Sequence, residues 1–244
     1  NWCAPWKTNE APGRFKVIVN GYPLSNELGL GNQWGWEYAG NVEIREKNNR
    51  VELHDLTGFA GRCDAILFTQ TKDIQIPNEG DKMYAFRKKL QGLPEKPENA
   101  GTYDMVVVGA GTAGLGAAIN GAGQGLKVAL IHDRPVPGGN NSIEVKVVAS
   151  GGLNLAPYTQ LGNVIKEIKN VYRNPEKVDK VITAEKNLSF FPNMHVFTLE
   201  KEADKIKSVT AKHIESNKEM IFHAPLFVDC TGDGNVGFLA GAEY

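Results

Sequence analysis

The pattern of apolar and polar positions divides the chain into two parts. Residues 15–19 alternate apolar with polar before the turn signal at residues 20–21, which predicts a half-buried strand. Residues 42–53 alternate around an Asn-Asn turn and predict a hairpin, and the apolar run at 65–68 predicts a core strand. Several short strands separated by turns favour an all-β sandwich or jelly-roll module, to which we assign residues 1–77.

Residues 78–102 have the composition of a linker, because prolines punctuate a mostly polar stretch. Apolar residues at 83, 86, 90 and 93 recur at helical spacing, so a short amphipathic helix is expected inside it. The basic run at residues 87–89 is expected to form a solvated face of that helix. The linker therefore predicts a boundary between a first module and a domain covering residues 103–244.

The second part begins with a βαβ pattern. The apolar run 105–108 predicts a buried parallel strand, residues 112–124 predict a helix that Gly125 ends, and residues 128–131 predict a second strand. Helices are also expected at 158–171 and 175–184. Strands at 195–199, 206–211 and 220–223 suit an antiparallel meander, and residues 225–229 predict a strand leading into a glycine-rich turn.

Three glycines follow the first of these strands in G-x-G-x-x-G spacing, at Gly109, Gly111 and Gly114. The first allows a tight turn, the second leaves the backbone open to a pyrophosphate, and the third lets helix and strand pack closely. The helix N-terminus then supplies free N–H groups and a positive dipole end. The alternative is a small-residue helix packed on a sheet without any ligand.

Two further loops have chemistry suited to the same ligand. Residues 134–142 carry paired glycines and asparagines, which supply backbone donors and tolerate positive φ. Residues 230–234 form a glycine-rich turn after the last predicted strand, where an α/β fold meets its ligand. An ordinary surface turn is the alternative for the first of these loops.

Composition excludes several other classes of function. Hydrophobic residues make up 41% of the 244 residues, which suits a globular chain with a sizeable core. The formal net charge of −1 shows no excess of basic residues of the kind that binds nucleic acid. No apolar run reaches the roughly 18 residues of a membrane span. The 3 cysteines and 5 histidines show no metal-ligand spacing, so we expect no metal site.

All four tryptophans precede residue 37, which leaves two interpretations open. They fill the core of the first module, or they present aromatic faces to a sugar. Trp34 and Trp36 lie two residues apart, so on a strand they would share one face. Nearby, Asp55, Arg62 and Asp64 form a polar cluster for which a structural ion pair is favoured over a ligand contact.

Three segments of the chain resemble a known family. The segments YDMVVVGAGTAGLGAA, ALIHDRPVPGGNNS and APLFVDCTGDGNVGFLAGAEY are similar to FAD-dependent oxidoreductases of the glutathione-reductase-like two-dinucleotide-fold group, of the type found in Bacteroidetes. The stretch containing PGRFKVIVNG, WGWEYAG and HDLTGFAGRCDAILFT resembles a golvesin or xanthan-lyase accessory module. The resemblance implies an α/β fold with a Rossmann-like FAD-binding domain and an antiparallel meander, preceded by a small all-β sandwich.

The resemblance also implies a set of cofactor-binding residues. These are Gly109, Gly111, Thr112, Ala113 and Gly114 at the pyrophosphate, Gly138, Gly139, Asn140 and Asn141 in the next loop, Val196 at adenine, and Thr231, Gly232 and Asp233 at the second flavin contact. His132, Asp133 and Arg134 stand near the adenosine ribose. His132 occupies the position where the family usually has an acid, so its contact with the ribose departs from the family pattern.

The function that follows is hydride or electron transfer between bound FAD and a small organic substrate, for which a carbohydrate is one candidate. Because the family continues well beyond the Thr-Gly-Asp-Gly motif, we expect this chain to be a fragment that lacks the substrate-activating groups. No catalytic residue can be assigned, and the compartment and oligomeric state stay open. Two alternatives remain: a nicotinamide-dependent dehydrogenase, and a carbohydrate-binding or interaction module without enzymatic activity.

Overall fold

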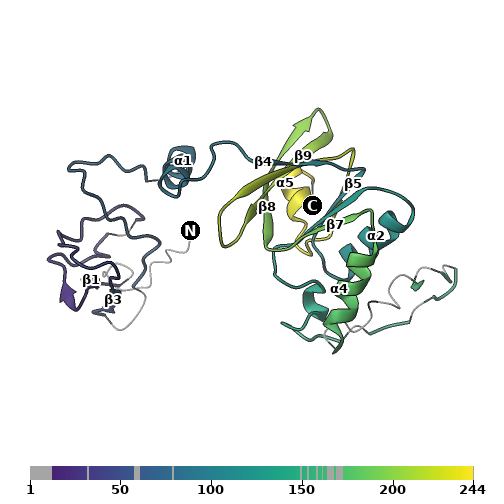
Figure 1. Ribbon diagram of the computed structural model, residues 1–244, viewed down its shortest axis with the longest axis horizontal. Coiled ribbons are helices and arrows are strands. Elements are labelled where there is room, and N and C mark those ends of the chain that lie inside the picture. Colours follow the sequence, from purple (N-terminus) through teal and green to yellow (C-terminus); the bar gives the residue numbers. More distant parts are fainter. Residues whose placement is uncertain are drawn as a thin grey trace. The chain divides into compact units, whose positions relative to one another are not determined.

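The computed structural model describes residues 13–31, 33–57, 61–78, 80–148, 150–152, 154–157, 159–160, 162–163, 168 and 173–243. The chain separates into two compact units, Asn1–Gln91 and Gly92–Tyr244 (Figure 1). The boundary between them falls inside the stretch 78–102, for which the sequence predicts a linker.

One antiparallel sheet forms the centre of the first unit. Its strands are β1 (Phe15–Val19), β2 (Tyr22–Pro23) and β3 (Val51–Asp55), in the order β2-β1-β3. The predicted turn between β1 and β2 is confirmed, because Asn20 and Gly21 both adopt positive φ, at 53° and 82°. Two such residues in sequence match the twist of a two-residue hairpin. The inward side of β1 packs with Leu24 and Leu28 in a small core.

The predicted pairing of residues 42–44 with β3 is wrong. β3 pairs with β1 instead, with Val19 opposite Val51, and residues 42–46 form no strand. The Asn20 and Asn49 side chains hydrogen-bond at 2.8 Å, and the Asn20 amide oxygen accepts from the Arg50 N–H at 2.8 Å. These bonds join the two turns and set the β1–β3 register.

The structure does not confirm the predicted sandwich. The described residues of this unit form a single sheet of three strands, and residues 65–68 form no strand, with Ile66 and Phe68 exposed. The predicted helix is present as α1 (Gly80–Leu90). Its basic run is not uniformly solvated, because Lys88 is only 8% exposed and its ammonium lies 5.7 Å from the centre of the Tyr84 ring.

A parallel sheet forms the centre of the second unit. Its strands are β5 (Met105–Val108), β6 (Val128–Ile131), β7 (Leu188–Phe191) and β11 (Leu226–Asp229), in the order β11-β5-β6-β7. The predicted strands and helices of the βαβ unit are confirmed, with α2 at Thr112–Gly123. β7 was not predicted from the sequence, because it is a short edge strand whose four residues are all only partly buried.

A second, mostly antiparallel sheet contains β8 (Met194–Glu202), β9 (Lys205–His213) and β10 (Glu219–His223), as the meander predicted. Its fourth strand, β4 (Glu98–Thr102), pairs in parallel with β10, so the order is β4-β10-β9-β8. The sequence predicts this strand to be the end of the linker. The segment Glu98–Thr102 reads ENAGT, and so it lacks the apolar alternation that would reveal a strand.

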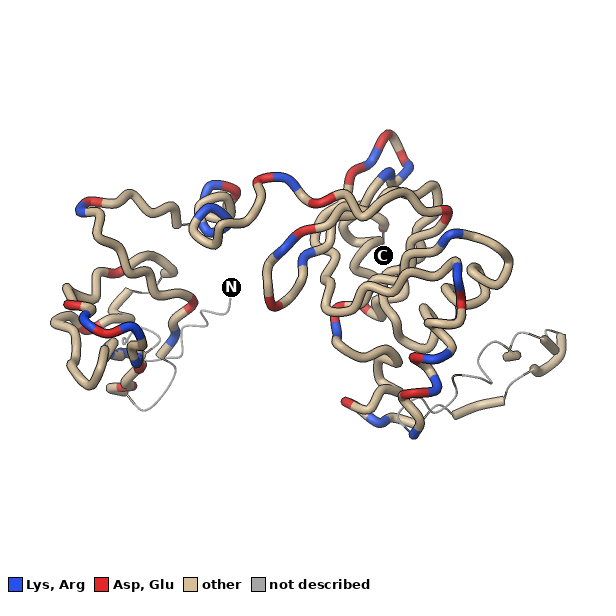
Figure 2. Tube along the Cα trace, viewed as in Figure 1, with Lys and Arg blue, Asp and Glu red and all other residues tan. Residues whose placement is uncertain are grey.

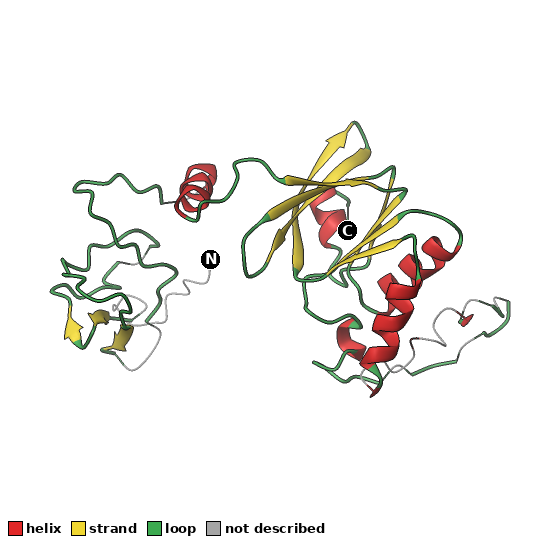
Figure 3. Cartoon of the chain, in the orientation of Figure 1, coloured by secondary structure: helices red, strands yellow, loops and turns green. Residues whose placement is uncertain are grey.

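The second unit has three layers. Met105 and Val107 face a core shared with α2 and α4 (Pro175–Ala184), whereas Val106 and Val108 face a core shared with the antiparallel sheet. Figures 1 and 3 show the two helices along one face of the parallel strands. Because both faces are covered, all four residues of β5 and all four of β6 are buried, as continuous apolar runs require.

Most of the helix predicted at 158–171 lies outside the described residues, although Ile168 is buried in the core beside α2 and α4.

Within the described ranges, no helix combines the length and apolar character needed to cross a bilayer. Acidic and basic residues are interspersed along the chain rather than gathered in one block (Figure 2).

Candidate functional site

A pocket of about 700 Å³ opens at the carboxyl ends of the parallel strands. It lies beyond β5, β6 and β11, where an open α/β sheet meets its ligand. Every predicted cofactor residue except Gly114 lines it: Gly109, Gly111, Thr112, Ala113, His132, Asp133, Arg134, Gly138, Gly139, Asn140, Asn141, Val196, Thr231, Gly232 and Asp233. The fold therefore brings together residues that lie up to 124 positions apart in the sequence, from Gly109 to Asp233.

The three glycines of the turn after β5 have different surroundings. Gly109 has φ +100°, and a Cβ there would lie 2.2 Å from the carbonyl oxygen of Cys230. A Cβ on Gly114 would lie 1.7 Å from the carbonyl oxygen of Gly109, so this glycine packs the helix on the turn. A Cβ on Gly111 would meet nothing within 4 Å. Packing requires the first and third glycines, whereas Gly111 faces open space in the pocket.

The start of α2 is open to an anionic ligand. Gly111 is its N-cap and offers no side-chain hydrogen bond, and the first turn carries no acidic residue. The first N–H groups of a helix have no partner within the helix, and the dipole places partial positive charge there. Thr112 and Ala113, which begin this turn, line the pocket. The geometry suits a phosphate or pyrophosphate.

The loop after β6 is joined directly to the glycine turn. The Gly138 N–H donates to the Ala110 carbonyl at 2.7 Å, and Gly111 and Gly138 form an isolated parallel bridge. A short 3₁₀ helix, η1 (Gly139–Asn141), follows. The Asn141 side chain is buried and donates to the Val147 carbonyl at 2.7 Å, so it shapes the loop from inside.

His132 is buried between these two loops. Its side chain is 6% exposed, and its Nδ1 accepts from the Ala110 N–H at 3.1 Å. Because Nδ1 uses its lone pair in this bond, neutral His132 carries its proton on Nε2, which is buried and makes no hydrogen bond to the described residues. Burial lowers the pKa of His132, with Asp133 and the Val136 carbonyl opposing that effect in part.

The neighbours of His132 are more exposed and less constrained. The Asp133 side chain is 56% exposed, and one of its carboxylate oxygens lies 3.6 Å from His132 Nδ1. Arg134 lies 3.6 Å from the Glu144 carboxylate, and both of these side chains are partly exposed. Consecutive residues thus have different environments at the end of β6, with His132 buried and its two neighbours at the surface.

The turn after β11 satisfies its own backbone groups. The Asp229 carboxylate accepts from the Thr231 N–H at 3.0 Å, the Thr231 hydroxyl at 2.7 Å and the Gly237 N–H at 2.9 Å. The Thr231 hydroxyl oxygen in turn accepts from the Asn235 N–H at 2.9 Å. Burial raises the pKa of Asp229, but the hydrogen bonds from Gly237 and Thr231 outweigh it and hold this pKa below its usual value.

Val196 is held at the pocket by the helix that follows this turn. The Asn235 side chain, at the start of α5 (Asn235–Ala240), donates to the Val196 carbonyl at 2.9 Å. Several residues that line the pocket were not predicted from the sequence, namely Val108, Ile131, Val147, Val148, Met194, His195, Cys230, Asn235 and Phe238. Four of these, Val108, Ile131, His195 and Cys230, are adjacent to predicted residues, whereas nothing in the sequence pattern indicated Val147 and Val148.

The described residues at the pocket offer binding groups but no evident catalyst. Burial raises the pKa of the Cys230 thiol, which keeps it protonated and weakly nucleophilic at neutral pH. Among the residues that the structure describes, no group of three or more His, Cys, Asp or Glu could hold a metal ion. The arrangement can bind and orient a nucleotide.

A parallel sheet, an uncapped helix after a G-x-G-x-x-G turn and a second glycine loop define a Rossmann-like, dinucleotide-binding protein. Comparison with known families gives the particular group. A model of the FAD dependent oxidoreductase family matches residues 104–244, and the chain belongs to this family. Its cofactor is FAD, and the open backbone at Gly111 and the uncapped start of α2 fit the pyrophosphate of that cofactor.

Curated relatives match over parts of their length. NADH:fumarate oxidoreductase of Klebsiella pneumoniae is 44% identical over 117 residues, which cover 47% of this chain and 12% of the relative. Urocanate reductase of Eggerthella lenta is 30% identical over 148 residues, which cover 58% and 23%. The chain therefore spans less than a quarter of either relative.

Among solved structures, the glycerol-3-phosphate dehydrogenase from Bacillus halodurans complexed with FAD is 13% identical, with a TM-score of 0.38. The alignment covers 60% of this chain and 37% of that protein.

Proposed function

We propose that the second unit holds FAD and that the enzyme to which it belongs transfers a hydride or an electron pair between the flavin and a small organic substrate. The observation that carries this proposal is the convergence of three separate loops on one pocket. These are the glycine turn after β5, the loop at residues 134–142 and the turn at residues 230–234. FAD, when bound, supplies the redox chemistry.

The residues of this chain have distinct proposed roles. Gly111, Thr112 and Ala113 present backbone N–H groups to the pyrophosphate, and Gly138 to Asn140 cover it from the next loop. His132, Asp133 and Arg134 lie on the adenosine side, with Val196. Thr231, Gly232 and Asp233 contact the flavin side. Gly114 and Asn141 act indirectly, because the first packs the helix on the turn and the second shapes the loop.

We assign no catalytic acid or base to the described residues that line the pocket, and we propose that other parts of the enzyme activate the substrate. Alone, this chain would bind FAD without turning over substrate. We assign the first unit the role of an accessory ligand-binding module of the golvesin or xanthan-lyase type.

A nicotinamide-dependent dehydrogenase is the competing function for the same glycine turn. The two additional loops at the pocket favour FAD, since a nicotinamide site requires only the first βαβ motif to hold its pyrophosphate. The test is to purify the 244-residue chain, record its absorbance spectrum, and identify any released cofactor by mass. Flavin bands and the mass of FAD are expected. Saturable binding of NAD(H) or NADP(H), with no uptake of added FAD, would contradict the proposal.

A further inference from the structure

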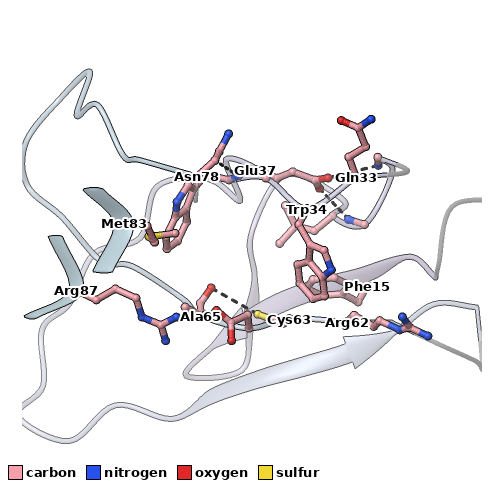
Figure 4. A pocket seen from close by; sticks show the side chains of 16 residues that line it. Phe15, Gln33, Trp34, Glu37, Arg62, Cys63, Ala65, Asn78, Met83 and Arg87 are labelled. Carbon is pink, nitrogen blue, oxygen red and sulfur yellow. Dashed lines mark hydrogen bonds and ion pairs between the residues drawn. The ribbon is translucent and has the colours of Figure 1, made fainter. Parts of the chain in front are cut away.

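The first unit contains a pocket that the flavin chemistry does not use. It has a volume of about 560 Å³ and is lined by residues of β1, of the segments 28–31, 33–37 and 62–65, and of α1. Figure 4 shows Trp34 over Phe15, with Arg62 beside them and Arg87 reaching in from the opposite wall. The size falls within the range of small-molecule sites.

The two tryptophans at this pocket are held differently. The Trp36 indole N–H donates to the Pro77 carbonyl at 3.0 Å, and its backbone N–H donates to the Asn78 side chain at 3.3 Å, so Trp36 joins the loop to the segment before α1. Trp34 is 49% exposed, and its indole N–H makes no hydrogen bond to the described residues. Trp34 therefore offers a free aromatic face and a free donor to a ligand.

The described charged residues that line the pocket are two carboxylates, Glu37 and Asp64, and two arginines, Arg62 and Arg87. Asp64 pairs with Arg87 at 2.9 Å, which corrects the expectation that the cluster of Asp55, Arg62 and Asp64 pairs within itself. The Glu37 carboxylate accepts from the backbone N–H groups of Gly29 and Gly31, at 2.8 Å and 3.4 Å. Arg62 is partly buried and forms no ion pair with the described residues. The Arg62 guanidinium thus has no carboxylate partner among the described residues, whereas backbone N–H groups hold the Glu37 carboxylate.

We propose that this pocket binds a saccharide that carries a carboxylate, such as a hexuronate unit. The apolar C–H face of a pyranose ring stacks on an aromatic ring, and its hydroxyl groups suit planar polar side chains such as Gln33 and Asn78 at the edge. The guanidinium of Arg62 is a bidentate partner for the carboxylate. A purely apolar ligand would leave these polar groups without partners as it removed them from water.

This inference rests on the ligand-binding role proposed for the first unit, and it is independent of the flavin site. A failure of the flavin proposal would appear in the cofactor spectrum of the same preparation. A failure of the saccharide proposal would appear only in sugar binding. The two results can therefore be distinguished on one protein sample.

The test is isothermal titration calorimetry of the 244-residue chain with a glucuronate oligosaccharide, and with a neutral glucose oligosaccharide of equal length. We expect saturable binding of the acidic sugar that Trp34→Ala weakens about tenfold and Trp34→Phe weakens less. Arg62→Gln should bring the affinity for the acidic sugar down to that for the neutral one. Tyr22→Ala is the matched control, because Tyr22 is an aromatic residue of the same unit, 76% exposed and outside the pocket.

Three outcomes would overturn the proposal. They are no binding of either sugar, binding unchanged by Trp34→Ala, and equal affinity of the wild-type protein for acidic and neutral sugars. Circular dichroism of each variant shows whether it folds. If Trp34→Ala is unfolded, Trp34→Phe and Arg62→Gln decide the result.

Discussion

The turns after β5 and β11 lie at the same pocket, and each leads from a parallel strand through glycines into a helix. They differ in where their N–H groups find partners. After β11, Asp229 and Thr231 accept from the Thr231, Asn235 and Gly237 N–H groups. After β5, no side chain caps α2, and Gly111 faces open space.

This difference separates two functions that look alike in the sequence. A turn that satisfies its own donors can serve as a rigid wall, whereas a turn with free donors is ready for an anion. We therefore assign pyrophosphate binding to the turn after β5, and we assign the role of a rigid pocket wall to the turn after β11. Substitutions at four positions test this account of the pocket, in decreasing order of expected effect.

Gly114→Ala should have the largest effect, and it should act on folding. Its Cβ would lie 1.7 Å from the Gly109 carbonyl oxygen, a backbone atom that cannot move without displacing the turn. We expect a loss of more than about 4 kcal/mol in the free energy of unfolding, measured by urea denaturation. The control is Gly116→Ala in the same helix, where a Cβ meets nothing within 4 Å. Equal stability of the two variants would contradict the close packing.

Gly111→Val should instead remove FAD binding and leave the fold intact. The backbone at Gly111 has φ −67° and ψ −179°, which any residue adopts, and a Cβ there enters the open pocket. We expect FAD affinity to fall by about a hundredfold, equivalent to about 3 kcal/mol, in a flavin fluorescence titration. Near-native affinity in a folded Gly111→Val protein would mean that the ligand does not approach this turn.

His132 should make the stability of the folded protein depend on pH. Its pKa is lowered in the folded state from the usual 6.5, so below that pH the unfolded chain binds more protons than the folded one. Stability should therefore fall as the pH decreases from 6.5 towards the folded pKa, and the Ala110 bond should be lost once Nδ1 is protonated. Because a glutamine amide can accept and donate in place of neutral imidazole, His132→Gln should reduce this pH dependence.

His132→Ala removes the acceptor altogether and should cost about 1–3 kcal/mol at neutral pH, by the same denaturation measurement. If His132→Gln shows the wild-type decline in stability below pH 6.5, another group is responsible for it.

Asp229→Asn should have the smallest effect. The amide retains one accepting oxygen but loses the charge, so we expect a loss of about 1 kcal/mol in unfolding free energy at neutral pH. Because the pKa of Asp229 is lowered in the folded state, its stabilising effect is present above the usual value of 3.8 and is lost as the pH falls through the folded pKa. The variant and the wild type should converge in acid. A constant difference down to the lowest pH would contradict the role of the charge.

The second unit was largely predictable, because its strands are continuous apolar runs bounded by glycine or polar residues. β5 and β6 were located to the residue. β4 and β7 were not located, since ENAGT has no apolar alternation and LSFF is a short edge strand. Long-range pairing, rather than local pattern, forms both of these strands.

The same limit explains the errors in the first unit. Hydrogen bonds of Asn20 with Asn49 and Arg50, which lie about 30 residues away, decide the partner of β3. At the candidate site, the sequence predicted which loops meet and the packing role of Gly114, but it did not predict the indirect role of Asn141. The inward amide of Asn141 depends on neighbours that only the fold provides.

The most direct test of the central claim is an NMR titration of the ¹⁵N-labelled chain with FAD. We predict the largest amide shifts at Gly111, Thr112 and Ala113 and at Gly138 to Asn140, with smaller changes in the hydrogen-bonded turn at Thr231 and Asn235. Binding that leaves Gly111 to Ala113 unchanged and shifts amides elsewhere would contradict the account.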